Sequence, residues 1–150
     1  MRSLLFSLVI LLFSGGAYAA EAVASVILSF GENVAAAPDG TERVLKRQSE
    51  VYQNEVLRTG SKGRLQLRFS DGSRFALKPG SEFRIAEYRF TQQQPEEGKA
   101  IFQLLKGGMR TISGQIGKGN KENYRLETTV ATIGIRGTHY GVEYIKDGIY

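Results

Sequence analysis

Two neighbouring segments of this chain alternate apolar and polar residues, and this pattern limits the possible folds more than any other. In residues 64–69 (RLQLRF) and 74–78 (RFALK), every second side chain is a large apolar one. A β-strand sends successive side chains to opposite faces, so each segment is predicted to be a strand with one buried and one solvated face. Asp71-Gly72 lies between them and predicts a tight reversal, which makes the pair a hairpin. Pro79-Gly80 predicts a type II turn into a third strand around residues 83–85.

Weaker strand patterns cover most of the remaining chain, and no segment beyond residue 19 shows helical periodicity over about 11 residues. Gly107-Gly108 is predicted to separate two of these strands. The roughly 130 residues that follow the leader described below suffice for one domain and leave no room for a second. We therefore predict a single all-β domain of about nine short strands, arranged as a β-solenoid-like or sandwich stack. The weaker strand patterns lie near residues 26–28, 44–45, 51–57, 100–105, 109–112, 124–129, 131–135 and 140–145.

Two polar segments, residues 91–99 (TQQQPEEGK) and 114–123 (GQIGKGNKEN), interrupt the strand patterns and are predicted to be surface loops or insertion sites. The second segment is rich in glycine, yet it does not match a phosphate-binding P-loop. That motif requires glycine five residues before its Gly-Lys pair and serine or threonine after it, where this chain has Ile112 and Gly119.

The first 19 residues have the pattern of a secretory signal peptide. A short basic start precedes an apolar run over residues 4–13, and Ala17-Tyr18-Ala19 places small residues at a cleavage site. A membrane span needs about 20 apolar residues, which disfavours the alternative of an uncleaved anchor. We expect cleavage after Ala19, a mature domain over residues 20–150, a periplasmic location and no transmembrane span in the mature chain.

Charge and cysteine content narrow the function classes. The chain carries 20 Lys and Arg against 15 Asp and Glu, a net charge of +5, which is mildly basic and gives no indication of nucleic-acid binding. It has no cysteine, which excludes disulfides, thiolate metal sites and a cysteine nucleophile. Packing alone is therefore expected to stabilise the fold.

Catalytic residue sets are not recognisable in the sequence. The one histidine, His139, lacks the further partners of a triad or a metal site, and we expect it to be exposed or structural. A His139/Glu143 pair is conceivable on one strand face, although the two residues are not adjacent. Glu96-Glu97 lies in a polar segment, where solvated carboxylates are expected. We predict no enzyme activity, no metal and no cofactor.

A basic strand face is the one electrostatic feature that suggests binding. If the alternating apolar side chains point inward, five cations point outward: Arg64, Arg68, Arg74, Lys78 and Arg84. Such a face is suited to an acidic protein surface, an anionic glycan or lipid head groups, because arginine contacts carboxylate and phosphate groups in a bidentate manner. The alternative is a solvated face that keeps sheet edges from pairing.

An ordered set of turn motifs resembles the FecR domain, a periplasmic module named from the ferric-citrate regulator. The resemblance covers residues 29–144 and rests on Thr59-Gly60, Gly63-Arg64, Asp71-Gly72-Ser73, residues 77–81 (LKPGS), Gly107-Gly108 and residues 130–138 (VATIGIRGT). It implies a compact all-β domain that acts through protein contact and has no known catalytic residues. Within residues 130–138, we expect Arg136-Gly137-Thr138 to be structural, with Gly137 permitting a bulge or a close backbone approach.

Signalling members of that family carry a cytoplasmic segment, a membrane span and usually a further small periplasmic domain, none of which is recognisable in this sequence. The expected function is therefore a non-catalytic interaction or signal-relay module that depends on a partner, most simply another envelope protein. A module that binds envelope glycan or lipid through the basic face is the alternative.

Overall fold

The computed structural model describes residues 20–134 and 139–144. The leader and the Arg136-Gly137-Thr138 element lie outside the described residues. The helical segments are short: two 3-10 turns, η1 (Pro95–Glu97) and η2 (Lys121–Asn123), and one helix, α1 (Gln115–Gly119). The strands are β1 (Ala22–Phe30), β2 (Asn33–Ala36), β3 (Glu42–Val44), β4 (Glu50–Tyr52), β5 (Val56–Thr59), β6 (Arg64–Phe69), β7 (Arg74–Leu77), β8 (Glu82–Arg89), β9 (Lys99–Ile112), β10 (Tyr124–Thr128), β11 (Thr132–Gly134) and β12 (His139–Tyr144).

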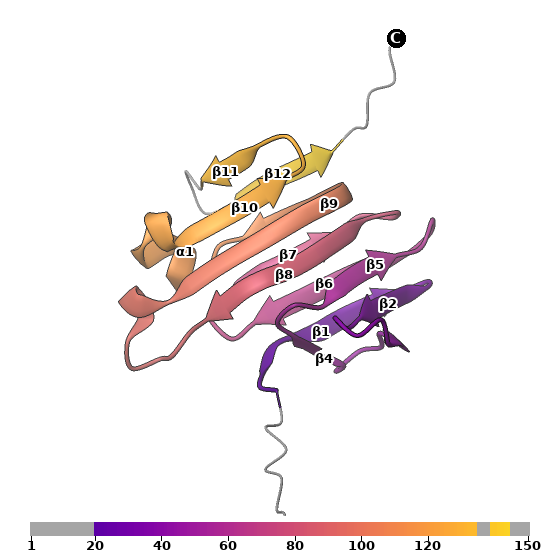
Figure 1. The fold of residues 1–150 in the computed structure, drawn as a ribbon, viewed down its shortest axis with the longest axis horizontal. Coiled ribbons are helices and arrows are strands. Elements are labelled where there is room, and N and C mark those ends of the chain that lie inside the picture. Colours follow the sequence, from indigo (N-terminus) through magenta and orange to yellow (C-terminus); the bar gives the residue numbers. More distant parts are fainter. Residues whose placement is uncertain (1–19, 135–138, 145–150) are drawn as a thin grey trace, which may run out of the picture.

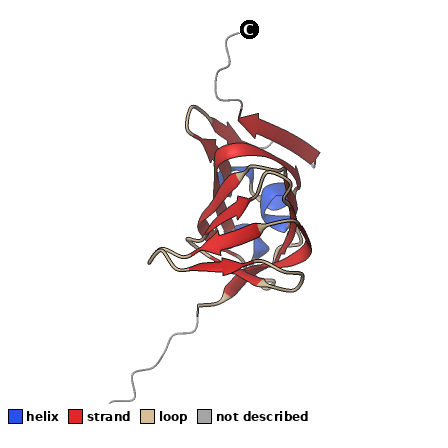
Figure 2. Ribbon diagram, turned by 90° about the vertical axis from the view of Figure 1, so that its right-hand side faces the viewer, coloured by secondary structure: helices blue, strands red, loops and turns tan. Residues whose placement is uncertain are grey.

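The strands form one curled sheet with the order β3-β2-β5-β8-β9-β7-β6-β1-β4 (Figure 1). Neighbours along this path are antiparallel, while β10 joins β9 in parallel and β12 joins it antiparallel. Figure 2 shows the strands curving around a common interior. The predicted all-β single domain is confirmed, and its nine-strand path folds around one apolar core.

Strand β9 connects the two halves of the sheet and runs through Gly107-Gly108, where the sequence predicted a break. Its first part pairs with β8 and its last part, residues 109–112, pairs with β7. Gly107 has a φ of +78°, and a Cβ there would lie 2.7 Å from Ser81 Cα. The Ser81 hydroxyl donates to Gly108 O at 2.9 Å and accepts from Gly108 N at 3.0 Å. The glycines therefore turn the strand from one half of the sheet to the other rather than ending it.

The predicted hairpin is formed by β6 and β7, and its inward residues build the core. Leu65, Leu67 and Phe69 alternate with exposed side chains, as expected. Phe102 on β9 lies at the centre of an aromatic cluster. Its ring centroid is within 4.7–5.6 Å of those of Phe69, Phe75, Phe83 and Tyr124.

The segment 114–123 is not the surface loop that its polarity predicted. It folds into α1, and Ile116 is fully buried in the core. The Asp71 backbone oxygen accepts from Gln115 N at 2.9 Å, and the Asp71 carboxylate accepts from Ile116 N at 3.3 Å. The helix α1 lies at one end of the sheet (Figure 1). Ile116 is therefore an apolar residue that the surrounding polar sequence did not reveal as part of the core.

Strand β1 contains a register shift that reverses its faces. Ala24 and Val26 are buried, and strict alternation would bury Leu28 and Phe30 as well. The pairing with β6 shifts between Val26 and Leu28, so that Leu28 and Phe30 point outward and Ser29 turns inward. The Ser29 hydroxyl donates to the Leu45 backbone oxygen at 2.7 Å. The bulge thereby directs the Ser29 hydroxyl inward to the Leu45 backbone and leaves the large apolar side chains of Leu28 and Phe30 exposed to solvent.

Candidate interaction surface

The outer side of β6, β7 and the last part of β9 forms a surface that we call the arginine face. Its central row consists of side chains in register on neighbouring strands: Gln66 pairs with Ala76, Ala76 with Arg110, and Arg110 with Gly141 of β12. These residues point outward because their neighbours in sequence fill the core. The arginine face comprises Arg64, Gln66, Arg68, Arg74, Ala76, Lys78, Arg110 and Ile112.

Four arginines on this face have no acidic partner among residues 20–134 and 139–144: Arg64, Arg68, Arg74 and Arg110. Arg68 and Arg74 are directly opposite each other in the β6–β7 register, an arrangement in which like charges repel. Lys78 is the exception, since its Nζ lies 2.6 Å from Glu143 Oε2. Acidic side chains flank the arginine face on its edge strands, with Glu50 on β4 and Glu143 on β12.

The other half of the sheet has a different outer surface, on which some of the charges are paired. Arg58 pairs with Glu42, and Lys99 Nζ lies 2.9 Å from Glu87 Oε2. Gln103 donates to Glu127 at 3.0 Å. Arg84 on β8 and Arg125 on β10 also have no ion pair within the described residues. The arginine face differs in that its four unpaired arginines lie together on the adjacent strands β6, β7 and β9.

The predicted five-residue basic face is corrected in one position. Arg64, Arg68, Arg74 and Lys78 lie together, but Arg84 is on β8, in register with Val56 and Gln103 in the other half of the sheet. Alternation fixes which side of a strand a residue occupies and not which strands become neighbours. Arg110, on the last part of β9, lies beside β7 and joins the arginines of β6 and β7 in place of Arg84. Arg110 was not among the residues predicted from the sequence, although the alternation in residues 109–112 (MRTI) carries the same signal.

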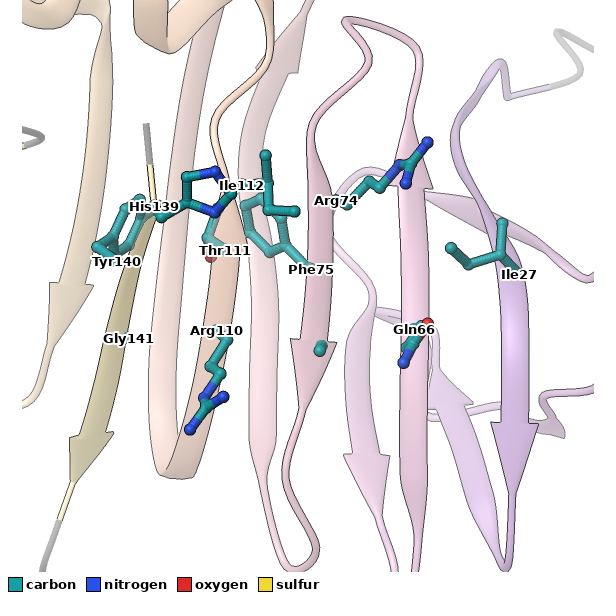
Figure 3. A pocket seen from close by; sticks show the side chains of 11 residues that line it. Ile27, Gln66, Arg74, Phe75, Arg110, Thr111, Ile112, His139, Tyr140 and Gly141 are labelled. Atoms are coloured by element: carbon teal, nitrogen blue, oxygen red, sulfur yellow. The ribbon is translucent and has the colours of Figure 1, made fainter. Parts of the chain in front are cut away.

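An open hollow of about 560 Å³ lies on the arginine face (Figure 3). Ala76 and Gly141 are the register neighbours of Arg110 on its two sides, and their small size leaves the middle of the face unfilled. A second hollow of about 470 Å³ extends toward Arg64 and Lys78 and shares Gln66, Ala76 and Arg110 with the first. The first is lined by Ile27, Gln66, Arg74, Phe75, Ala76, Arg110, Thr111, Ile112, His139, Tyr140 and Gly141.

Titratable side chains other than the cations also lie near these hollows. His139 is exposed and in register with Ile112, while Glu143 contacts Lys78. The hydroxyl groups of Tyr124 and Tyr140 share a hydrogen bond, and burial raises the pKa of both phenols. In the part of the chain that the structure describes, no three His, Cys, Asp or Glu side chains are grouped as metal ligands would be.

The turn motifs noted in the sequence hold the corners of the sheet together. Thr59 N donates to Ser81 O at 2.9 Å, and its hydroxyl donates to Lys78 O at 2.6 Å. Gly80 N donates to Gly60 O at 3.0 Å. These contacts join the turn after β5 to the turn after β7, so these motifs have a structural role. The solvent-facing sheet surface is left as the candidate site.

The described residues form a single all-β domain with one curled sheet. The chain belongs to the FecR family, since the family model described as FecR protein matches residues 55–150. This is a non-enzymatic signalling family, and the match leaves β1–β4 outside its bounds.

Among curated proteins, none matches the chain in sequence. A solved structure described as a cell surface anchoring domain shares 26% identity, covering 41% of this chain and 82% of that one with a TM-score of 0.40. None of the helices within the described ranges has the length and apolar character needed to cross a bilayer.

Proposed function

We propose that this protein is a non-catalytic periplasmic module that binds another envelope protein through the arginine face and so takes part in signal relay. The observation that carries the proposal is the group of Arg64, Arg68, Arg74 and Arg110, which have no acidic partner in the described structure. The leader pattern of residues 1–19 supports export to the periplasm. Membership of the FecR family supports a role in signalling.

The physical basis is charge complementarity. Neighbouring strands lie about 4.8 Å apart, so the arginines of β6 and β7 repel one another in the free protein. Carboxylates on a partner would relieve this repulsion, and the planar guanidinium groups suit bidentate contacts with them. Exposed charge pairs act mainly on association rate and specificity, so binding is expected to weaken as salt is added.

An anionic envelope glycan or lipid head group is the second candidate partner, because the same unpaired arginines would contact carboxylate or phosphate groups on a polymer. The two candidates differ in a measurable way. A polymer is bound by the purified protein alone, whereas a protein partner forms a defined crosslinked species in cells.

The test is site-specific photo-crosslinking in intact cells, with a photoreactive amino acid at Gln66 in the centre of the arginine face. The same group at Gln92, an exposed residue of the 91–99 segment, is the matched control. We expect a discrete protein adduct from Gln66, absent from Gln92 and lost when Arg68 and Arg74 are changed to glutamate. Equal labelling from both positions would contradict the proposal, and salt-sensitive binding of the purified protein to envelope polymer would favour the alternative.

Export is tested separately. We expect the cellular protein to begin at Ala20 and to be released with the periplasmic fraction. An intact N-terminus starting at Met1, measured by mass spectrometry, would contradict the proposed location.

A further inference from the structure

The two apolar side chains that the β1 bulge turns outward lie beside the arginine face. Phe30 is 65% exposed and Leu28 is 42% exposed. In the pairing of β1 with β6, Leu28 is opposite Gln66 and Phe30 is opposite Arg64. The bulged residue, Ile27, lines the same hollow as Gln66 and Arg74 (Figure 3). An apolar strip on β1 is therefore continuous with the cationic surface.

This exposure results from a specific backbone feature. Without the register shift, Leu28 and Phe30 would continue the buried row of Ala24 and Val26. Bulges of this kind commonly re-aim side chains at functional surfaces. On the arginine face itself Ile112 is also 38% exposed, so apolar side chains lie on both sides of the cations. Adjacent apolar groups of this kind mark an interaction site more strongly than scattered ones.

We infer that β1 and the arginine face form one bipartite docking site for a protein segment that carries large apolar and acidic side chains together. This inference rests on the proposed function and specifies its partner. Leu28 and Phe30 would contact the apolar side chains of that segment, while Arg64 and the Arg68/Arg74 pair bind its carboxylates. Because Arg64 and Arg68 are four residues apart on one strand, the two anionic positions are separated by about 13 Å.

The shape and edges of the surface favour a protein segment over a membrane. The two hollows share Gln66, Ala76 and Arg110, and together they form a depression that a planar lipid surface cannot fill. Glu50 lies on the flanking strand β4, where an extended anionic surface would meet negative charge. A second copy of this chain would place the same arginines face to face. A narrow protein segment with acidic and apolar side chains can enter the depression, does not extend to the flanking strand and brings no further arginines to the surface.

The experiment combines the photoreactive group at Gln66 with the double substitution Leu28→Ser and Phe30→Ser. We expect the yield of the protein adduct to fall about tenfold or more, as for anchor residues of an interface, with an unchanged melting temperature because both side chains are exposed. Val44→Ser with Val130→Ser is the matched control, since these residues are 63% and 78% exposed away from the face. This control pair should leave the adduct unchanged.

The outcomes separate this inference from the proposed function. An adduct that persists in the Leu28/Phe30 variant but disappears in an Arg68→Glu variant would overturn the bipartite site and leave arginine-dependent docking in place. A lack of any Gln66 adduct in the unsubstituted protein would instead contradict the proposed function. Sedimentation of the purified protein with phosphatidylglycerol vesicles, abolished by Phe30→Ser, would replace the protein partner with a lipid surface and also overturn the inference.

Discussion

The backbone N–H of Asp71 donates a 2.9 Å hydrogen bond to the hydroxyl oxygen of Tyr88. This contact joins the β6–β7 turn to β8, and Ser70 Oγ donates to the same oxygen at 3.1 Å. The Asp71 carboxylate accepts from Ser73 N at 3.0 Å and from Ser73 Oγ at 2.6 Å. The predicted Asp71-Gly72 reversal is therefore also a tertiary junction. Burial raises the pKa of the Tyr88 phenol well above its usual range, and the Asp71 charge adds to the effect.

The protein is expected to lose stability in alkali. Tyr88, Tyr124 and Tyr140 all have a raised pKa in the folded protein, caused first by desolvation. A phenol whose pKa is raised on folding stays neutral in the folded state while it ionises in the unfolded chain, which binds fewer protons. The free energy of unfolding should therefore be retained below pH about 10, the usual tyrosine pKa, and fall above it. Urea unfolding at a series of pH values measures this slope.

Tyr88→Phe provides the control for the alkaline transition. It removes one of the three buried phenols, so the loss of stability above pH about 10 should become less steep. At neutral pH the same substitution leaves the Asp71 N–H without its acceptor and should lower stability by about 1–3 kcal/mol. If the free energy of unfolding of this variant fell with rising pH as steeply as that of the unsubstituted protein, the contribution assigned to Tyr88 would be contradicted.

Gly114→Ala is expected to destabilise the fold strongly. A Cβ at this position would lie 2.5 Å from Asp71 Oδ2 and 2.5 Å from Ser73 N, so the turn would have to move. Overpacking of this kind costs on the order of 1–3 kcal/mol. Gly119→Ala is the matched control, because no atom lies within 4 Å of its Cβ position. Equal melting temperatures for the two variants would show that the turn adapts without strain.

Arg68→Glu is expected to stabilise the free protein although it removes binding. The new carboxylate would oppose Arg74 in the antiparallel register and replace a repulsive cross-strand pair with an attractive one. Such a change contributes about 0.2–1 kcal/mol and should shrink in about 1 M salt, where the screening length falls to about 3 Å. Arg47→Glu, in the exposed turn before β4, serves as the control in urea unfolding at low and high salt. A variant less stable than the parent at low salt would refute the repulsion.

Phe102→Ala should cause the largest loss of stability among single core truncations on β9. Its ring contacts aromatic side chains from both halves of the curled sheet. The distance between ring centroids is 4.7 Å to Phe75 and 5.5 Å to Phe83. Removing a buried phenylalanine typically costs about 3–5 kcal/mol. Ile101→Ala, one residue away and on the outer side of the strand, should cost clearly less. Chemical denaturation of both variants compares the two faces directly.

Predictions from the sequence succeeded where the controlling interactions are local. The hairpin follows from side-chain alternation in residues 64–69 and 74–78, and Gly80 has the positive φ of 66° that the Pro-Gly turn requires. The outward direction of Arg64, Arg68 and Arg74 follows from the same alternation. In each case, neighbouring residues in the chain are enough to specify the conformation.

Predictions failed where contacts between residues far apart in the sequence determine the structure. Arg84 points outward as expected, yet β8 pairs with β5 and the first part of β9, so it leaves the basic face. Ile116 is buried because Asp71, in the β6–β7 turn, accepts hydrogen bonds from the backbone of α1. Neither pairing has a signature within a short window of sequence.

The order of residues is enough to specify an all-β chain, its principal hairpin and turns, and which side chains of that hairpin face solvent. These features follow from a repeat of two residues and from the backbone preferences of glycine and proline. The folded protein was needed to see that β9 continues through Gly107-Gly108, that Arg110 joins the arginines of β6 and β7, and that a bulge exposes Leu28 and Phe30 beside them. Strand order and register arise from long-range pairing and packing, which local periodicity does not encode.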